Sequence, residues 1–366
     1  MVFRLEKRAR SSRAMAAIAP LTAALLTVVG GAILFSSLGH NSVDAFRTFF
    51  ITPVSDLYGI GELSLKMAPI LLCALGLAIG FRGNVWNIGA EGQLIVGAIC
   101  GGGFALALGK IDGLWVVPAI LLTGAIGGIA WASIAAVLRT RFNANEILVT
   151  LMLTYIAGLL LSYLVYGPWR SPTGFNWPVS SDLAASARLP RLIPGTRLNL
   201  GIVIAIVFTG CAWLFQARSH LSYRMEVGGL APRAARYAGF DEHKLVWTSL
   251  LIGGAAAGLA GAIEVSGTIG KLREVVSPGY GFAAIIVAYI GRLHPVGIFF
   301  ASILMALFYV GGEQIKVTLG VPSAITGIFQ GMLLFSLLMS DVLINYRLRW
   351  SRNRPIATKG NTHAVS

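Results

Sequence analysis

The chain has 366 residues, of which 56% are hydrophobic and 12% charged, and its formal net charge is +14. Soluble domains carry about 25% charged residues, so this composition excludes an ordinary soluble protein and indicates a chain embedded in lipid. The basic residues lie between long apolar runs rather than along one soluble face, which argues against a nucleic-acid partner.

Ten apolar runs follow one another along the chain, most of them near the roughly 20 residues that a helix needs to cross a bilayer. The first follows a basic segment over residues 1–15 and is too long for a typical signal peptide, so we expect a retained span. The eighth is short, which predicts a broken or re-entrant helix. The predicted spans cover residues 16–37, 63–81, 90–109, 114–138, 146–166, 199–217, 244–264, 279–291, 295–314 and 323–345.

Lys and Arg residues are distributed unevenly among the segments that connect these spans. With the N-terminus inside, about two-thirds of them fall in inside segments, as the positive-inside rule requires. Both termini are then cytoplasmic, with a tail over 346–366, while the loop at 167–199 lies outside and the basic loop at 218–243 inside. The sequence thus predicts one all-α, multi-pass transmembrane domain over 1–366 in the inner (plasma) membrane.

Spans two to five and seven to ten share a plan, because each group contains a helix interrupted near Gly and Pro residues. One interruption covers Asn84–Gln93 and is predicted inside, whereas the other covers Ser277–Phe282 and is predicted outside. Breaks on opposite sides are typical of inverted repeats around a central pathway. We therefore expect an inverted repeat, with Tyr280 and Phe282 on the pathway.

Polar residues gather at the first interruption, where the sequence reads FRGNVWNIGAEGQLIVG. Unpaired polar groups are costly in hydrocarbon, so the cluster either lines water or forms internal hydrogen bonds. A break that lines a pathway and a tight cytoplasmic turn with an acidic helix cap fit this pattern equally well. The candidate pathway residues here are Asn84, Asn87, Glu91 and Gln93.

Small and polar side chains recur every four residues in the fifth predicted span, which places them on one helix face. That face must meet protein or water, and it fits a pathway wall beside Tyr155 or, somewhat better, close helix packing. Its members are Glu146, Thr150, Thr154, Gly158 and Ser162.

The seventh span carries Gly254, Gly258 and Gly261, a spacing that predicts close helix packing. Glu264 follows on the face of Gly261. Because a carboxylate inside a membrane is costly unless it is paired or hydrated, we expect Glu264 to have a structural or pathway ion-pair role.

The inside loop contains a short predicted helix that begins at Pro232 and is closed by Gly239. A small amphipathic helix with Ala and Tyr at its surface fits docking into a groove on another protein. A solvated loop that anchors on lipid headgroups through its arginines is the alternative. The residues concerned are Arg233, Ala234, Ala235, Arg236, Tyr237, Ala238 and Gly239.

The sequence has no pattern for covalent chemistry. The stretch Gly267–Lys271 lacks the spacing of a phosphate-binding loop, and no nucleophile elbow or paired-histidine zinc motif occurs. We therefore expect a protein without enzymatic activity, catalytic residues, cofactor or metal.

Four blocks in order resemble the permeases of ATP-binding-cassette importers of the branched-chain amino acid, ribose and nucleoside group. They are FRGNVWNIGAEGQL, NEILVTLMLTYIA, the stretch Leu221–Glu264 with AARYAGF and GAIE, and SPGYGFAAIIVAYIGRLHP. The form GFRGNVWNIGAEGQL and the outer-loop segments GPWRSPTGFNWP and ARLPRL are similar to the nucleoside-type branch.

This resemblance implies a type II-like importer subunit that moves nucleosides or related small polar solutes inward by alternating access, with residues 233–239 coupling it to ATPases. It also implies partners: a homologous second permease subunit, two cytoplasmic ATP-binding subunits and an external solute-binding protein, in addition to the lipid bilayer. A ribose-like sugar permease and an ion-coupled secondary transporter, with Glu91 or Glu264 as its ion site, are the alternatives.

Overall fold

The computed structural model describes residues 2–7, 13–109, 111–174, 177–322, 324–325, 327–329, 331–332, 335–336, 339 and 346–351. They belong to two compact units, a terminal unit of residues 1–42 and 327–366 and a central unit of residues 43–326. Each unit is described by itself. The single domain expected from the sequence stays a prediction.

The terminal unit contains helix α1 (Arg13–Ser37), which covers the first predicted span. Strands β1 (Val2–Lys7) and β2 (Tyr346–Ser351) pair antiparallel, an element that the sequence analysis did not anticipate. The rings of Phe35 and Phe329 lie 5.5 Å apart and join α1 to the C-terminal part of this unit. Most of the tenth predicted span, 323–345, and of the predicted tail lies outside the described residues.

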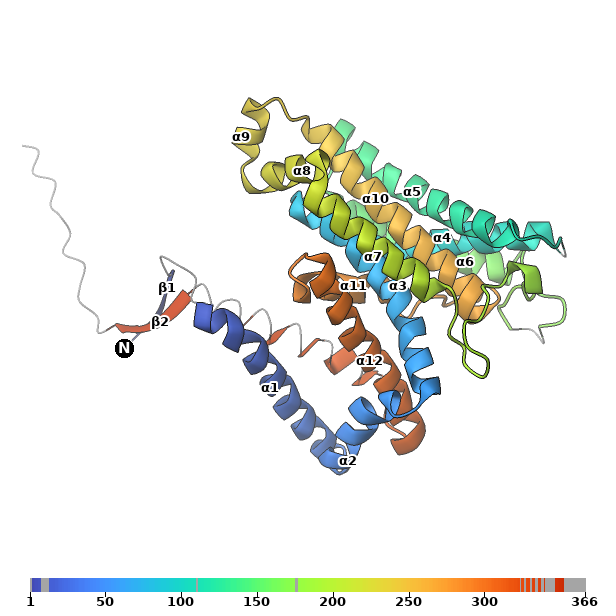
Figure 1. Ribbon diagram of the computed structural model, residues 1–366, viewed down its shortest axis with the longest axis horizontal. Coiled ribbons are helices and arrows are strands. Elements are labelled where there is room, and N and C mark those ends of the chain that lie inside the picture. Colours follow the sequence, from blue (N-terminus) through green and yellow to red (C-terminus); the bar gives the residue numbers. More distant parts are fainter. Residues whose placement is uncertain are drawn as a thin grey trace, which may run out of the picture. The chain divides into compact units, whose positions relative to one another are not determined.

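The central unit is a helical bundle (Figure 1). Three short helices lead into it, namely α2 (Ser42–Phe46), η1 (Arg47–Ile51) and η2 (Thr52–Val54). The long elements follow: α3 (Leu57–Arg82), α4 (Ala90–Leu108), α5 (Val116–Phe142), α6 (Glu146–Tyr166), α7 (Gly201–Arg218), α10 (Glu242–Ile263), continued by the π-helix η4 (Glu264–Ile269), and α12 (Pro295–Leu319). The shorter ones are η3 (Ala185–Ala187), α8 (His220–Leu230), α9 (Pro232–Tyr237) and α11 (Tyr280–Ile290).

Seven helices of the described part are long and apolar enough to cross a membrane: α3, α4, α5, α6, α7, α10 with η4, and α12. The helical class and the multi-pass membrane character are thus confirmed. Helix α11 has 11 residues and is too short to span a bilayer by itself, as expected for the eighth run. The total of ten spans and the inverted repeat stay predictions.

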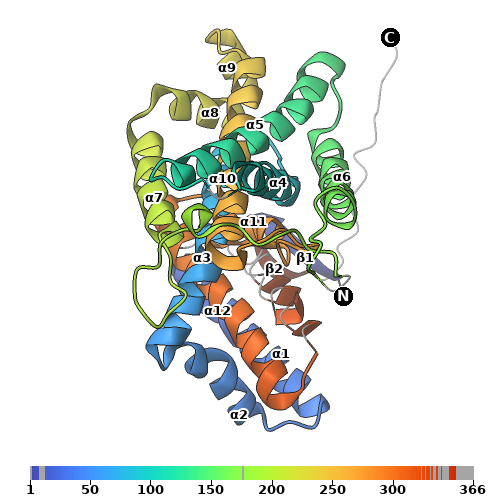
Figure 2. The ribbon, with the colours of Figure 1, turned by 90° about the vertical axis from the view of Figure 1, so that its right-hand side faces the viewer.

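Helix α3 lies at the centre of this unit, because 89% of its spanning segment is buried. The spanning segments of α6 and α7 are only 22% and 17% buried. These two helices occupy opposite flanks of the unit (Figure 2). Their outward faces are therefore the apolar surface available to lipid.

Glycines allow α4, α5 and α10 to touch backbone to backbone. A Cβ on Gly97 would lie 2.3 Å from the Cα of Gly258, and a Cβ on Gly128 would lie 2.1 Å from the carbonyl oxygen of Gly254. A Cβ on Gly261 would lie 1.9 Å from the Leu94 carbonyl oxygen. The close packing predicted for the seventh span is confirmed.

The two large loops lie at opposite ends of the bundle. Figure 1 shows α8 and α9 beside the start of α10, and the segment between α6 and α7 at the other end. This arrangement agrees with the sidedness that the predicted topology requires. Helix α8 was not foreseen; it is capped by Ser219, whose hydroxyl accepts a hydrogen bond from the Leu221 N–H.

Candidate functional site

The two interruptions meet inside the central unit. A carboxylate oxygen of Glu91, in the first turn of α4, accepts a 2.7 Å hydrogen bond from the N–H of Gly281, in the first turn of α11. A Cβ on Gly281 would lie 2.3 Å from the Glu91 backbone nitrogen, so the two turns are in direct contact. The prediction that the breaks lie on opposite sides of the membrane is therefore wrong. The contact has a physical cause. The first N–H groups of a helix have no partner within that helix, so a helix that begins inside the bundle needs an acceptor from another segment.

Glu91 is buried, with 4% of its surface exposed. Its carboxylate is also a hydrogen-bond partner of the Ser277 hydroxyl, whose oxygen accepts a 2.9 Å bond from the Tyr280 N–H. The carboxyl group stands at the N-termini of two helices, where their dipoles favour an anion. Glu91 therefore caps α11 across the bundle, an arrangement different from both alternatives drawn from the sequence.

Asn87 and Gln93 bond to each other rather than lining water. The Asn87 side-chain amide donates a 3.0 Å bond to the Gln93 side chain, and the Asn87 side-chain oxygen Oδ1 accepts one of 2.9 Å from the Gly89 N–H. Asn84 differs, because it is exposed, has a left-handed φ of 56°, and accepts a 3.0 Å bond from the Trp86 indole. The buried amides thus hold the irregular backbone between α3 and α4.

The polar stripe of α6 packs against this backbone. The Thr150 hydroxyl accepts a 3.2 Å bond from the Ile88 N–H, and a Cβ on Gly92 would lie 2.7 Å from the Thr154 Cα. Gly158 has no neighbour within 4 Å at its Cβ position, so the packed face does not continue through it. The predicted stripe is wrong in its second half, because steps of four residues drift around a helix with 3.6 residues per turn. The buried face runs instead through Ala157, Leu161 and Val165.

The remaining predicted pathway residues of this region are dispersed. Glu146 begins α6 and lies 3.4 Å from Arg139 in an ion pair. Tyr155 is 63% exposed on the outer side of α6, and Phe282 is 40% exposed on α11.

Glu264 and Tyr280 lie in a second polar region. Glu264 is the first residue of η4 and Tyr280 the first of α11, and their exposed fractions are 4% and 0%. One carboxylate oxygen of Glu264 and the hydroxyl of Tyr280 have no hydrogen-bond partner among the described residues. A buried polar atom left unpaired costs about 1–3 kcal/mol, so both atoms need an explanation.

Residues of α3 and α12 extend this region into the interior polar cluster, by which we mean Lys66, Glu264, Tyr280, Tyr309 and Glu313; its outer edge is Glu313, whose side chain is 59% exposed. Lys66 binds Glu313 at 2.8 Å and is also the strongest cationic influence on Glu264. The Tyr309 ring meets the Tyr280 ring edge to face, with centroids 5.3 Å apart. The sequence analysis missed Lys66 and Glu313, although a charged residue inside an apolar run is itself a signal of function.

A small cavity lies beside this cluster at the loop end of the unit. Its volume is about 80 Å³, and it is lined by η4 residues including Thr268 and by three arginines, Arg188, Arg191 and Arg197. Thr268 also forms a side-chain hydrogen bond with Glu264. Arg197 binds the Glu62 carboxylate at 3.2 Å and the Thr268 carbonyl oxygen at 3.1 Å. Thr268 therefore connects the cavity to the polar cluster.

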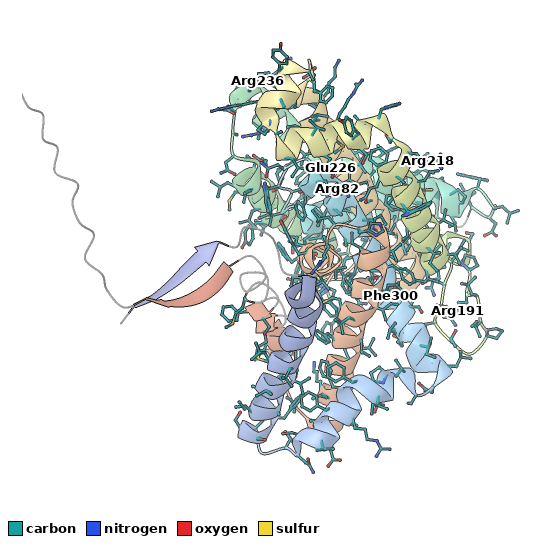
Figure 3. The ribbon with its side chains drawn as sticks, turned by 60° about the vertical axis from the view of Figure 1, so that its left-hand side comes forward. Arg82, Arg191, Arg218, Glu226, Arg236 and Phe300 are labelled. Atoms are coloured by element: carbon teal, nitrogen blue, oxygen red, sulfur yellow. The ribbon has the colours of Figure 1, made fainter. Side chains whose placement is uncertain are left out.

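Helix α9 forms the opposite end of the unit. It begins at Pro232 as predicted, and Gly239 has the left-handed φ of 76° expected after it. Ala235 is buried, whereas Tyr237 is 97% exposed. Arg236 lies at the tip of the unit and pairs with Glu242 at 3.4 Å, while Arg82 and Glu226 lie beneath it (Figure 3). The other predicted coupling residues are exposed: Arg233, Ala234, Ala238 and Gly239.

Comparison with known proteins shows the family of the chain. Residues 59–338 match the family described as branched-chain amino acid transport system / permease component. A glucose ABC transporter permease of Haloferax volcanii is 31% identical, covering 90% of this chain and 89% of that protein. A guanosine ABC transporter permease of Bacillus subtilis is 30% identical, with 85% and 90% covered. A nucleoside ABC transporter permease of Lactococcus lactis subsp. cremoris is 25% identical, with 89% and 92% covered.

Each of these three organisms has a second similar permease; the one of Haloferax volcanii, a putative glucose ABC transporter permease, is 29% identical, covering 56% of this chain and 61% of that protein. A second guanosine permease of Bacillus subtilis is 26% identical, covering 68% of this chain and 79% of that protein. A second nucleoside permease of Lactococcus lactis is also 26% identical, covering 72% of this chain and 86% of that protein. Among solved structures, an inward-facing conformation of a putative metal-chelate type ABC transporter aligns with a TM-score of 0.47 at 18% identity, covering 87% of this chain and 98% of that one.

Proposed function

The chain belongs to the family of permease components of branched-chain amino acid transport systems, and on this basis we propose that it is the membrane-spanning subunit of an importer for nucleosides or related small polar solutes. The guanosine and nucleoside permeases that resemble it over most of its length support this solute class. The permease itself catalyses no reaction; separate subunits hydrolyse ATP.

The observation that carries the proposal is the exposure of Tyr237, 97%, on a short helix at one end of the bundle. Aromatic and arginine side chains dominate the energy of protein interfaces, so Tyr237 and Arg236 are suited to anchor a partner. Ala235 and Gly239 fix the helix from which these two side chains project. In our proposal α9 docks on a cytoplasmic ATP-binding subunit.

A continuous series of contacts leads from α9 into the bundle. Helix α9 is followed by α10, whose glycines touch α4 and α5. Helix α4 in turn holds α11 through the bond between Glu91 and Gly281. Movement of α9 would therefore reach the half-helix α11, and we propose that this movement opens the pathway alternately to the two sides.

The partners in this proposal are a second permease chain, two ATP-binding subunits and an external solute-binding protein. The presence of two similar permeases in Bacillus subtilis and in Lactococcus lactis supports the paired permease. The loop between α6 and α7 lies at the end opposite α9 (Figure 1), so it is the surface that we assign to the external protein.

A sugar is the second candidate solute, because the glucose permease of Haloferax volcanii is 31% identical to this chain. ATP-dependent uptake of labelled guanosine and of labelled glucose into vesicles that contain the complete importer tests both. We expect guanosine to be taken up, and uptake stopped by omitting ATP. Uptake of glucose alone would assign the chain to sugars, and uptake of either solute without ATP would refute an importer of this class.

A further inference from the structure

The unpaired atoms of the interior polar cluster are chemically complementary. In its ionised form Glu264 accepts hydrogen bonds through its unpaired oxygen, whereas the Tyr280 hydroxyl is available to donate one. A hydroxyl group accepts from a donor and donates to an acceptor at the same time. Resting on the function proposed above, we propose that Glu264 and Tyr280 bind a hydroxyl group of the solute, on the sugar ring of a nucleoside or of a free sugar.

No side chain or backbone group of the described residues satisfies these atoms. Glu264, Glu313 and Glu91 are the carboxylates that act on the Tyr280 hydroxyl electrostatically, yet this hydroxyl bonds to no described residue. Lys66, the leading cation near Glu264, is held at 2.8 Å by Glu313. The unpaired oxygen of Glu264 and the Tyr280 hydroxyl therefore remain available to a ligand, because the neighbouring charged side chain of Lys66 is bound to Glu313.

The charges around the pair favour a neutral ligand. Three carboxylates face Tyr280, while Lys66, Arg273 and Arg197 act on Glu264. Charges of both signs surround the pair, so the protein offers an ion neither a net positive nor a net negative site. A polyhydroxyl ring carries no charge and offers the donors and acceptors that both atoms lack.

The position of the pair fits a solute contact. Glu264 opens a π-helix, a form that occurs frequently at functional sites, and Tyr280 opens the half-helix α11. Thr268 joins Glu264 to the 80 Å³ cavity at the loop end of the unit. The edge-to-face rings of Tyr280 and Tyr309 add an apolar surface on which the carbon face of a sugar can rest.

The test removes one hydroxyl from the protein and one from the solute. Uptake of guanosine, 2′-deoxyguanosine and 3′-deoxyguanosine is measured with the intact importer in vesicles, for the parent and for Tyr280→Phe. We expect the parent to prefer guanosine to one deoxy analogue by roughly tenfold and Tyr280→Phe to reduce this preference to about one. Glu264→Gln should weaken the same preference. Selection by the external protein contributes equally to parent and variant, so it cancels in the comparison.

Tyr289→Phe is the matched control, because Tyr289 lies on the same helix and stacks on Trp86 outside the polar cluster. It should leave the preference unchanged. An unchanged preference in Tyr280→Phe would overturn the inference. If the melting temperature of that variant also falls, the Tyr280 hydroxyl binds a structural water rather than the solute. If the parent takes up neither guanosine nor glucose, the proposed function fails as well, whereas parental uptake with an unaltered preference defeats the inference alone.

Discussion

The carboxylate of Glu91 holds the backbone N–H of Gly281, a residue 190 positions later in the chain, at 2.7 Å. A single buried side chain thus joins the starts of α4 and α11. The first prediction concerns this bond.

Replacing Glu91 by Ala leaves the Gly281 N–H unpaired in the protein interior, at a cost of about 1–3 kcal/mol. We expect the melting temperature of the purified protein to fall by several degrees and uptake to decrease. Glu91→Gln keeps an acceptor at this position, so this variant should retain most of the thermal stability and most of the uptake. If Gln is as damaging as Ala, the charge of Glu91 rather than its hydrogen bond is what matters.

Gly258→Ala tests the packing of α10, since its Cβ would lie 2.3 Å from the Gly124 carbonyl oxygen. We expect little folded protein in the membrane, because neither backbone can move without separating α5 from α10. Gly158→Ala and Gly210→Ala are the controls, as neither Cβ would meet an atom within 4 Å. Both should accumulate like the parent. Equal accumulation of all three variants would contradict the glycine contact.

Tyr237→Ala and Arg236→Glu should abolish uptake and reduce co-purification of the ATP-binding subunit, while the chain still reaches the membrane. Tyr163→Ala removes a similarly exposed tyrosine, 68%, from the flank of α6 and should have no such effect. A loop that only anchors on lipid predicts a mild effect of Arg236→Glu and intact ATPase association in Tyr237→Ala. Transport at the parental rate by both variants would exclude α9 as the coupling element.

A periplasm-active reporter inserted after Ser186 should be active, because the loop between α6 and α7 is predicted outside. The same reporter inserted after Ala238, beside α9, should be inactive. An inactive reporter after Ser186 at normal expression would reverse or refute the orientation.

The sequence predicted most of the spans because length and apolar content decide them locally. The start and end of α9 followed from Pro232 and Gly239, and the glycines of α10 indicated close packing. Helix α3 begins six residues before its predicted start, because the Asp56 side chain caps it through the Gly59 N–H at 2.9 Å. Such signals act within a few residues and can be read directly.

Contacts between distant segments could not be read in this way. The cap that Glu91 provides for α11 depends on how two breaks enter the bundle, which no local pattern encodes. The polar stripe of α6 was extended to Gly158 because a spacing of four was treated as one face. Lys66 and Glu313 were overlooked because each lies near the end of a predicted span, and only the folded bundle pairs them.

The ion pair of Lys66 and Glu313 closes a separation of 247 residues, and this has a consequence for how the protein is made. Ribosomes add about 5–20 residues per second, so Lys66 leaves the ribosome roughly 12–50 seconds before its partner is synthesised. During that interval α3 carries an unneutralised cation, which its flexible stem can extend toward the membrane surface. The ion pair that joins α3 to α12 therefore forms only after α12 is made, and a nascent chain that stops before Glu313 should lack this contact.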